Sequence, residues 1–275
     1  MKKTAVLVML ALLASAPGWA AFTLGTDITV WDGLGAKPVS GHGEDNETEP
    51  GTVQGQEWDL EGFFLTRDNV LQLVGGYNFY GGLMYDDRWI MPGDLFIDVD
   101  GLFGSRDHGS HMGYEYAVSW VNVANTVGNN SPEKATVYKL GRGVELLSVT
   151  DITDSDPWKL GNKGVKPGRV DVQNSVTYTP DVRSLDEVSL WNGRGVHNIV
   201  EFDLNWLIED MKDEEWWTGE INVHYTYQCG NDLIKGSGSL VLPDDPGVVI
   251  PEPASITLMG LGIAAVAVSR LRKAA

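Results

Sequence analysis

Short apolar runs separated by turn-forming residues are the feature that most limits the fold of this 275-residue chain. The runs are rich in Val, Ile, Thr and aromatic residues, and clusters of Gly, Asp, Asn and Pro interrupt them. They do not alternate regularly with helical segments, as the strands of a parallel sheet would. The pattern predicts an all-β fold, a single antiparallel, jelly-roll-like β-sandwich. The ten clearest expected strands are Thr26–Trp31, Val70–Tyr80, Asp94–Val99, Tyr114–Val123, Lys134–Leu140, Val144–Val149, Ser175–Thr179, Asn198–Asp203, Glu220–Tyr227 and Gly238–Leu242.

One segment has helical rather than strand periodicity. Its apolar side chains recur at the spacing of one helix face: Leu204, Leu207, Ile208 and Met211. The pattern predicts a short amphipathic helix within Asp203–Trp217, with Asp203 as its N-cap. Residues 36–57 and 151–170 are expected to form long loops. In Glu220–Tyr227, apolar and polar residues alternate, which predicts a strand buried on one face only.

The C-terminal residues combine three elements in a fixed order. Pro251, Glu252 and Pro253 come first, and the two prolines disfavour both helix and sheet. The next 16 residues, Ala254–Ser269, carry no charge and would make about 24 Å of helix, slightly short of a full membrane span. The basic residues that follow favour a cytoplasmic C-terminus: Arg270, Arg272 and Lys273. An ordinary single-pass anchor is the alternative interpretation of the span.

This order resembles the PEP-CTERM sorting domain of Gram-negative bacteria, over Pro251 to Lys273. The resemblance implies that an exosortase in the inner membrane recognises the tail and removes it. The protein would be anchored transiently by the C-terminal span and then reach the cell surface or the extracellular matrix. Members of this family are commonly associated with exopolysaccharide production and with biofilm or floc formation.

The N-terminus has the features of a Sec-type signal peptide. Lys2 and Lys3 precede the apolar stretch Ala5–Ala14, and the small residues Gly18 and Ala20 indicate a cut after Ala20. The expected partners are therefore the Sec translocon and signal peptidase, and an uncleaved anchor is the alternative. These assignments divide the chain into a signal peptide at 1–20, an acidic domain at 21–248 and a sorting signal at 249–275.

The region between the two processing segments is strongly acidic. Residues 21–250 hold 15 Lys and Arg against 37 Asp and Glu, a net charge of −22. Such a chain repels nucleic acid and anionic lipid, so nucleic acid is excluded as a partner. It suits extracellular solubility or the binding of divalent cations. Cys229 is the single cysteine, so the domain has no internal disulfide and depends on its core. We interpret Cys229 as a buried hydrophobe rather than a nucleophile activated by His224.

The run Gly93–Gly101 contains the residues best suited to a metal ion. Asp94, Asp98 and Asp100 share one face of an extended strand, and Asp98 and Asp100 stand beside a glycine turn. Oxygen ligands of this kind suit Ca²⁺, although the run is not an EF-hand loop. The sequence therefore offers a calcium site at Asp98 and Asp100, with turn-forming, solvated aspartates as the alternative. The later run Gln228–Asp232 is interpreted as a structural corner.

Tryptophan is abundant, with nine of the ten lying between the processing segments. Indole faces stack on sugar rings, so an exposed tryptophan next to polar side chains is suited to glycan binding. Trp89, Trp191 and Trp216 are the candidate ligand-binding residues, although most tryptophans of a sandwich belong to the core. Trp89 follows Tyr85-Asp86-Asp87-Arg88, and Trp191 precedes Asn192-Gly193-Arg194.

No established catalytic motif occurs in the sequence, so a non-enzymatic function is expected. Together these features predict an exported, exosortase-processed protein with a structural or adhesive role in an exopolysaccharide or biofilm matrix. The alternative is a carbohydrate-binding module or a glycoside hydrolase acting on the matrix polysaccharide. Glu57, Asp59 and Glu61 are expected on one face of an extended segment and offer the carboxylates that a hydrolase would need.

Overall fold

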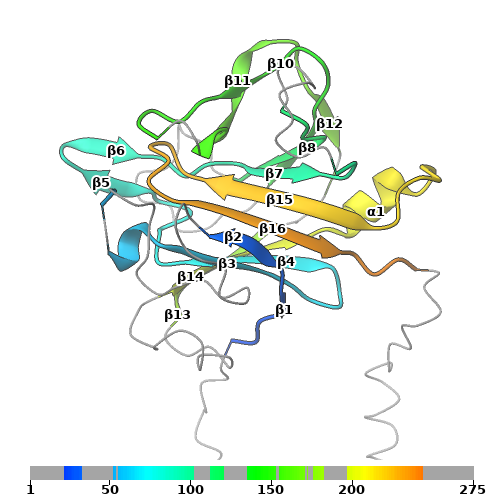
Figure 1. The fold of residues 1–275 in the computed structure, drawn as a ribbon, viewed down its shortest axis with the longest axis horizontal. Coiled ribbons are helices and arrows are strands. Elements are labelled where there is room, and N and C mark those ends of the chain that lie inside the picture. The colour runs from blue at the N-terminus through cyan, green and yellow to red at the C-terminus, as the bar shows by residue number, and fades with distance from the viewer. Residues whose placement is uncertain are drawn as a thin grey trace, which may run out of the picture.

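The computed structural model describes a β-sandwich with a smaller layer on one face (Figure 1). The described residues are 22–32, 52–53, 55–101, 112–120, 135–152, 155–170, 172, 176–182 and 197–243. One sheet has five strands in the order β1-β3-β4-β14-β13. Its strands are β1 (Thr26–Asp27), β3 (Leu60–Leu65), β4 (Val70–Gly75), β14 (His197–Asp203) and β13 (Val176–Val182).

The opposing sheet has seven strands in the order β12-β9-β8-β7-β15-β16-β2. Every pair of neighbours in both sheets is antiparallel, as the sequence predicted. The strands of the second sheet are β12 (Gly168–Val170), β9 (Thr136–Lys139), β8 (Tyr116–Ser119), β7 (Leu95–Asp98), β15 (Glu220–Thr226), β16 (Leu233–Ser239) and β2 (Thr29–Asp32).

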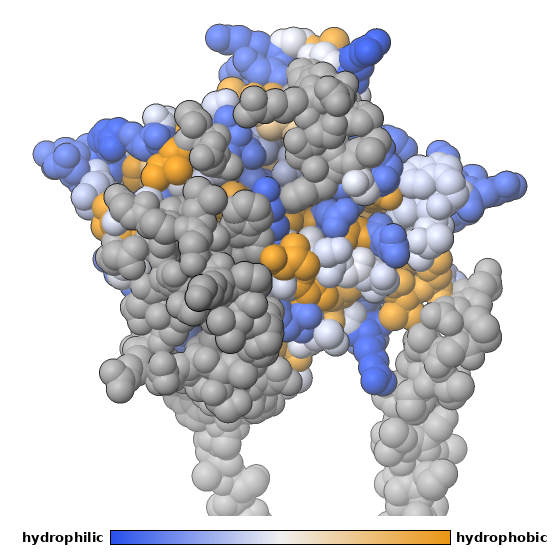
Figure 2. Space-filling model, in the orientation of Figure 1, coloured by the Kyte–Doolittle hydropathy of each residue, from blue (hydrophilic) through white to orange (hydrophobic). Residues whose placement is uncertain are grey.

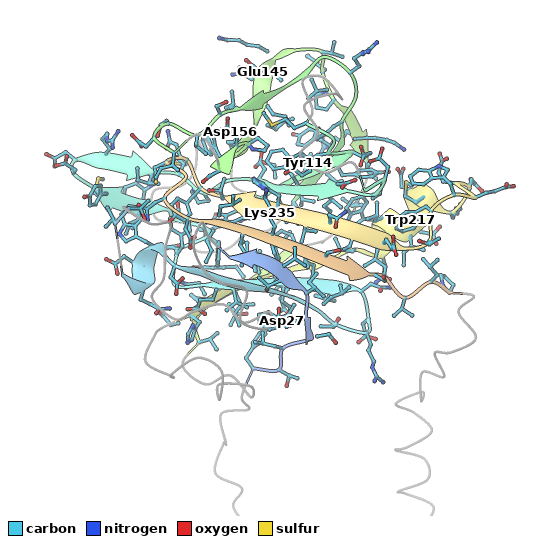
Figure 3. All side chains as sticks on the ribbon, in the orientation of Figure 1. Asp27, Tyr114, Glu145, Asp156, Trp217 and Lys235 are labelled. Atoms are coloured by element: carbon cyan, nitrogen blue, oxygen red, sulfur yellow. The ribbon has the colours of Figure 1, made fainter. Side chains whose placement is uncertain are left out.

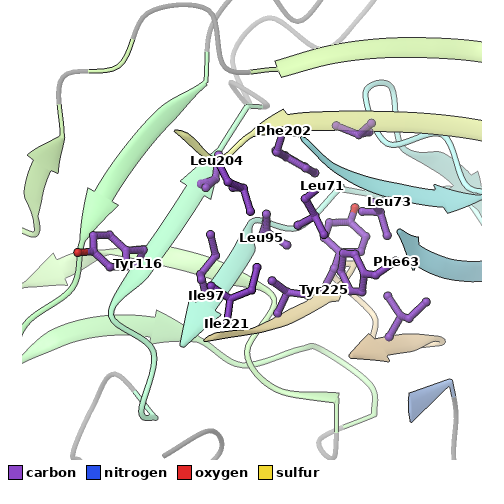
Figure 4. Close-up of a cluster of buried hydrophobic side chains, with 14 of the residues drawn as sticks. Phe63, Leu71, Leu73, Leu95, Ile97, Tyr116, Phe202, Leu204, Ile221 and Tyr225 are labelled. Atoms are coloured by element: carbon purple, nitrogen blue, oxygen red, sulfur yellow. The ribbon is translucent and has the colours of Figure 1, made fainter. Parts of the chain in front are cut away.

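Apolar side chains from both sheets meet between them and form the main core (Figure 4). Phe63 and Leu73 come from the five-stranded sheet, and Ile97 and Tyr225 come from the seven-stranded sheet. All four side chains have no exposed surface. Burial of apolar area on this scale is the main force that holds two sheets together, and it supplies the stability that disulfides give to many exported domains.

A two-stranded sheet covers part of the outer face of the seven-stranded sheet. It consists of β10 (Val144–Leu147) and β11 (Lys159–Gly164). Tyr114 lies in the layer beneath it, where it packs with Phe96 and Val144 (Figure 3). The prediction that β15 is buried on one face only is wrong. His224 and Thr226, on the polar face of β15, are also fully buried.

His224 shows how a polar side chain is accommodated in that layer. Its Nε2 lies 2.8 Å from the carbonyl oxygen of Pro157. Its ring makes a tilted contact with the ring of Tyr114, with centroids 5.6 Å apart and ring planes at 50°. Burial, and then the positive charge of Lys235, lower the pKa of His224 to about 3. The imidazole is therefore neutral and serves as a packed, hydrogen-bonded core group.

The helix and loop predictions need correction. Helix α1 spans Asn205–Met211, which is shorter than the predicted Asp203–Trp217. The N-cap position is Leu204, because Asp203 still belongs to β14, although its carboxylate accepts the backbone N–H of Asn205 at 2.9 Å. The segment 151–170 is not one long loop, since it contains β11 and β12.

Two further corrections concern the segment before β4. Most of the loop predicted at 36–57 lies outside the described residues, and its end forms the 3-10 helix η1 (Gln56–Trp58). Strand β3 was not among the expected strands. It lacks alternation because both of its faces are buried: Phe63 packs in the main core, and Phe64 packs with Leu24 and Ile199 on the other side of the sheet.

Candidate functional site

An acidic trio lies where β7 ends beside the start of β8. Asp98 closes β7, Asp100 follows two residues later, and Glu115 directly precedes β8. One carboxylate oxygen from each residue lies within 4.8 Å of the others. The structure thus brings Asp98 and Asp100 together and adds Glu115, which sequence reasoning missed. Asp94, which was expected on the same strand face, instead bonds Lys159.

Hydrogen bonds orient two of these carboxylates, those of Asp98 and Glu115. The Oδ1 atom of Asp98 accepts from the N–H groups of Asp100 and Gly101, both at 2.9 Å, and its Oδ2 accepts from the side-chain amide of Asn222 at 3.1 Å. Glu115 Oε2 accepts the N–H of Val99 at 2.9 Å. A set of oriented carboxylate oxygens is the ligand chemistry that Ca²⁺ prefers.

Two carboxyl groups of the trio, those of Glu115 and Asp98, have raised pKa values, mainly because they are buried. Burial, and then the charges of Asp100 and Asp98, raise the pKa of Glu115 to about 7. Burial also raises the pKa of Asp98, against the opposing effect of the hydrogen bonds from Asp100, Asn222 and Gly101. With a pKa of about 7, the carboxyl group of Glu115 is about half protonated at neutral pH.

The β5–β6 hairpin is the second candidate site, and it projects from one end of the sandwich (Figure 1). Strands β5 (Leu83–Tyr85) and β6 (Arg88–Ile90) are joined by Asp86 and Asp87, whose φ angles of 47° and 58° are those of a type I′ turn. Hydrophobic and hydrophilic residues lie side by side at this end of the molecule (Figure 2).

The hairpin presents different side chains on its two faces. Met84 pairs across the strands with Trp89, and Tyr85 pairs with Arg88, so the two pairs face opposite sides. Met84, Tyr85 and Trp89 are 57%, 41% and 40% exposed. Tyr85 also makes an edge-to-face contact with the buried Trp58. One face of the hairpin is therefore solvent-exposed, and the other is anchored to the core.

The tryptophans predicted to bind a ligand have different environments. Trp89 lies on the exposed face of the hairpin, whereas Trp216 lies beyond α1 and is 54% exposed. Its neighbour Trp217 is buried and donates from Nε1 to the carbonyl oxygen of Glu220 at 2.9 Å (Figure 3). Trp191 lies outside the described residues. Trp89 belongs to β6, whereas Trp216 lies in the segment after α1. The structure therefore gives no sign that the two side chains share one binding surface.

The run Gln228–Asp232 forms a corner that connects distant segments. Asn231 donates from its side-chain amide to the carbonyl oxygen of Val53 and accepts the N–H of the same residue, both at 2.9 Å. Asp232 accepts the N–H of Leu60 at 2.6 Å. Cys229 is buried here, and burial, followed by the charge of Asp151, raises the pKa of its thiol to about 11. Such a thiol is a poor nucleophile at neutral pH.

The carboxylates considered for a hydrolase do not share a strand face. Glu57 lies in η1, whereas Asp59 and Glu61 are fully buried. Glu61 contacts His197 Nδ1 through both carboxylate oxygens, at 2.8 and 2.7 Å. The Glu61–His197 contact joins β3 to β14 inside the protein, so we assign it a structural role.

Comparison with known proteins identifies the C-terminal segment. Residues 249–273 match the PEP-CTERM protein-sorting motif, and the matched range includes Pro251, Glu252, Pro253 and the basic end. The match confirms the predicted resemblance. It indicates an exported protein that is processed by an exosortase and ends at the cell surface. No curated protein and no solved structure matches the chain. Among the described residues, no helix is long and apolar enough to cross a membrane.

Proposed function

We propose that this protein is a component of the cell surface or extracellular matrix whose β-sandwich adheres to polysaccharide. The sorting motif supports delivery to the surface, and the strong acidity of residues 21–250 favours solubility there. A structural or adhesive role in an exopolysaccharide or biofilm matrix fits both properties. A carbohydrate-binding module acting within that matrix is the closest alternative, and it shares the same binding chemistry.

The observation that carries the proposal is the exposure of apolar side chains on the β5–β6 hairpin. Most of the tryptophans whose side chains are described are buried in the cores, whereas Met84 and Trp89 stand opposite each other in solvent. Exposed apolar side chains that lie next to each other on a protein surface often mark binding sites. The turn residues Asp86 and Asp87, which join the two strands, add hydrogen-bond acceptors to the same hairpin, and this combination suits the hydroxyl groups and apolar faces of sugars.

Co-sedimentation with insoluble neutral polysaccharides tests this function. The protein would be produced from its full-length sequence, and any unprocessed material would be kept in mild detergent. We expect saturable binding that Trp89→Ala weakens, because the substitution removes an exposed stacking surface. Val165→Ser is the control, since Val165 directly follows β11, away from the hairpin, and is 57% exposed against 40% for Trp89. Trp216→Ala tests the second candidate residue, and absence of binding by the unaltered protein would contradict the proposal.

We also propose the route of export. The Sec translocon would carry the chain across the inner membrane of a Gram-negative bacterium, and signal peptidase would cut after Ala20. The C-terminal span would hold the protein transiently until an exosortase processes the tail. The acidic domain would then comprise about residues 21–248. Mass spectrometry of the exported protein tests this route through the mass of its N-terminal and C-terminal peptides. An N-terminal peptide that still contains Lys2 and Lys3 would contradict signal cleavage.

A further inference from the structure

A cavity of about 270 Å³ lies behind the β5–β6 hairpin. Its lining includes Trp58 from η1, Tyr85 and Arg88 from the inner face of the hairpin, Asp151, and Cys229 of the corner. This volume is just below the roughly 300–1,000 Å³ that is usual for small-molecule pockets, so the cavity suits a ligand as small as one sugar ring. Aromatic and apolar walls with a few polar groups are typical of small-molecule sites.

We propose that this cavity binds a single sugar ring of a neutral polysaccharide. The inference rests on the proposed function and names the site and the class of glycan. It adds to the contact at Trp89, on the outer face of the hairpin, a second contact at Tyr85 and Arg88 on the inner face. Because residues alternate along a strand, the inner face of the hairpin contacts the ring in the cavity, while Trp89 on the outer face remains available to another part of the polymer.

The polar groups at the cavity suit sugar hydroxyls. Arg88 Nη2 and Asp151 Oδ2 lie 3.9 Å apart, which is beyond direct hydrogen-bonding distance, and both side chains are substantially exposed. A guanidinium donates several hydrogen bonds and a carboxylate accepts several, so adjacent hydroxyl groups of one ring can bond both. The hydroxyl of Thr150 donates to Asp151 Oδ2 at 2.8 Å and helps to orient the carboxylate.

The aromatic wall suits the apolar face of the same ring. Tyr85 is held edge-on against Trp58, with ring centroids 5.2 Å apart, while 41% of Tyr85 remains exposed. Holding an aromatic ring in place before binding lowers the entropy cost of association. The buried thiol of Cys229 adds an apolar surface to the same cavity, because its raised pKa keeps it uncharged.

The charged side chains around the cavity favour a neutral glycan over an acidic one. The opposite charges of Arg88 and Asp151 balance each other at the cavity, and the adjacent turn adds the two carboxylates of Asp86 and Asp87. The whole chain carries a net charge of −18. A polyuronate or sulfated polymer would meet net repulsion here, whereas a neutral glycan would not.

Calorimetric titration with neutral hexasaccharides of glucose, mannose and galactose, and with a polyuronate hexamer, tests the proposal. The protein would be prepared from the full-length sequence as above. We expect at least one neutral oligosaccharide to bind and the polyuronate not to bind. Tyr85→Ala, Arg88→Ala and Asp151→Asn should each weaken binding by about tenfold, the usual scale for a lost contact with a polar ligand. Val165→Ser, beyond the end of β11 and away from the cavity, should leave the affinity within about twofold.

Cys229 provides a second readout that needs no substitution. It is the single cysteine of the chain and lines the cavity, so a bound sugar should slow its modification by methyl methanethiosulfonate. An unchanged modification rate at a saturating concentration of a binding oligosaccharide would place the ligand elsewhere and overturn the assignment. This measurement also decides the question if Tyr85→Ala fails to fold.

The outcomes separate this inference from the proposed function. If polysaccharide binds but only Trp89→Ala weakens it, the cavity assignment fails and the adhesive function stands. If the polyuronate binds more tightly than every neutral hexasaccharide, the assignment to neutral glycans fails. If neither the oligosaccharides nor the insoluble polysaccharides bind, both proposals fail.

Discussion

Tyr85 meets Trp58 edge to face, with ring centroids 5.2 Å apart and ring planes at 89°. This contact joins the projecting hairpin to the core, because Trp58 is buried and its carbonyl oxygen accepts the hydroxyl of Tyr227 at 2.6 Å. Two short strands alone would be marginally stable in water. The Tyr85–Trp58 contact therefore gives the candidate binding surface a fixed position.

The contact should contribute measurably to stability. Tyr85→Leu should lower the free energy of unfolding by about 1 kcal/mol, because it replaces an aromatic pair with an aliphatic contact. Tyr85→Phe should retain most of that stability, since the ring remains. Urea unfolding followed by tryptophan fluorescence measures both changes. Equal losses in the two variants would contradict a role for the ring contact.

The ion pair between Lys159 and Asp94 should stabilise the β10–β11 layer. Lys159 Nζ lies 3.2 Å from Asp94 Oδ1, and both side chains are largely buried. Lys159→Met should cost about 3 kcal/mol, because it leaves a buried carboxylate without its cation. Adding Asp94→Asn should recover much of this loss, since the amide oxygen can still accept the N–H of Leu160. A single variant as stable as the unaltered protein in urea would contradict this assignment.

The raised pKa of Glu115 should make stability depend on pH. The folded protein binds this proton more tightly than the unfolded chain does, since the pKa rises from 4.5 to about 7 on folding. The stabilising contribution is complete below pH 4.5 and is lost as the pH rises through 7. Glu115→Gln should remove this loss, so the variant should gain about 2 kcal/mol relative to the unaltered protein between pH 5 and 8. The measurement is chemical unfolding in chelator at both pH values, and a constant difference would contradict the prediction.

Calcium should bind the acidic trio and replace the proton. We expect millimolar Ca²⁺ to raise the Tm by a few degrees above its value in chelator, because a ligand of the folded state stabilises it. Mg²⁺ should have less effect, since it requires a smaller, more regular ligand shell. Glu115→Gln should lose most of the shift, and the shift should grow from pH 6 to pH 8. Equal Tm values in Ca²⁺ and chelator would contradict a metal site at Asp98 and Asp100.

Strand positions were predictable where one face of a strand is solvated or the run is rich in β-branched residues. Each of the ten expected strands overlaps an observed one. Strand β3 was missed because burial on both faces removes the alternation. Strand β11, with the sequence Lys-Leu-Gly-Asn-Lys-Gly, has little intrinsic strand preference, and its pairing with β10 and the Asp94 contacts hold it in place.

The candidate sites depend on contacts between residues that are far apart in the sequence, and these contacts could not be predicted from the sequence. Asp98 and Asp100 are close in the chain, but Glu115 reaches them only through the register of β7 against β8. Neighbouring tryptophans also differ in burial: Trp217 is covered by the fold, whereas Trp216 is not. The sequence did not indicate the hairpin whose register places Tyr85 and Trp89 on opposite faces. It also did not indicate the cavity on the Tyr85 side, because the cavity requires Asp151 and Cys229 from distant segments.

Retention in the extracellular matrix tests the central claim most directly. Cells would produce either the unaltered chain or the Tyr85→Ala variant, and the matrix would be washed with a neutral oligosaccharide or with buffer. The account predicts that the unaltered protein remains in the matrix after the buffer wash and leaves with the oligosaccharide, whereas the variant leaves with buffer. Recovery of the unaltered protein in the medium, or equal retention of both proteins, would contradict it.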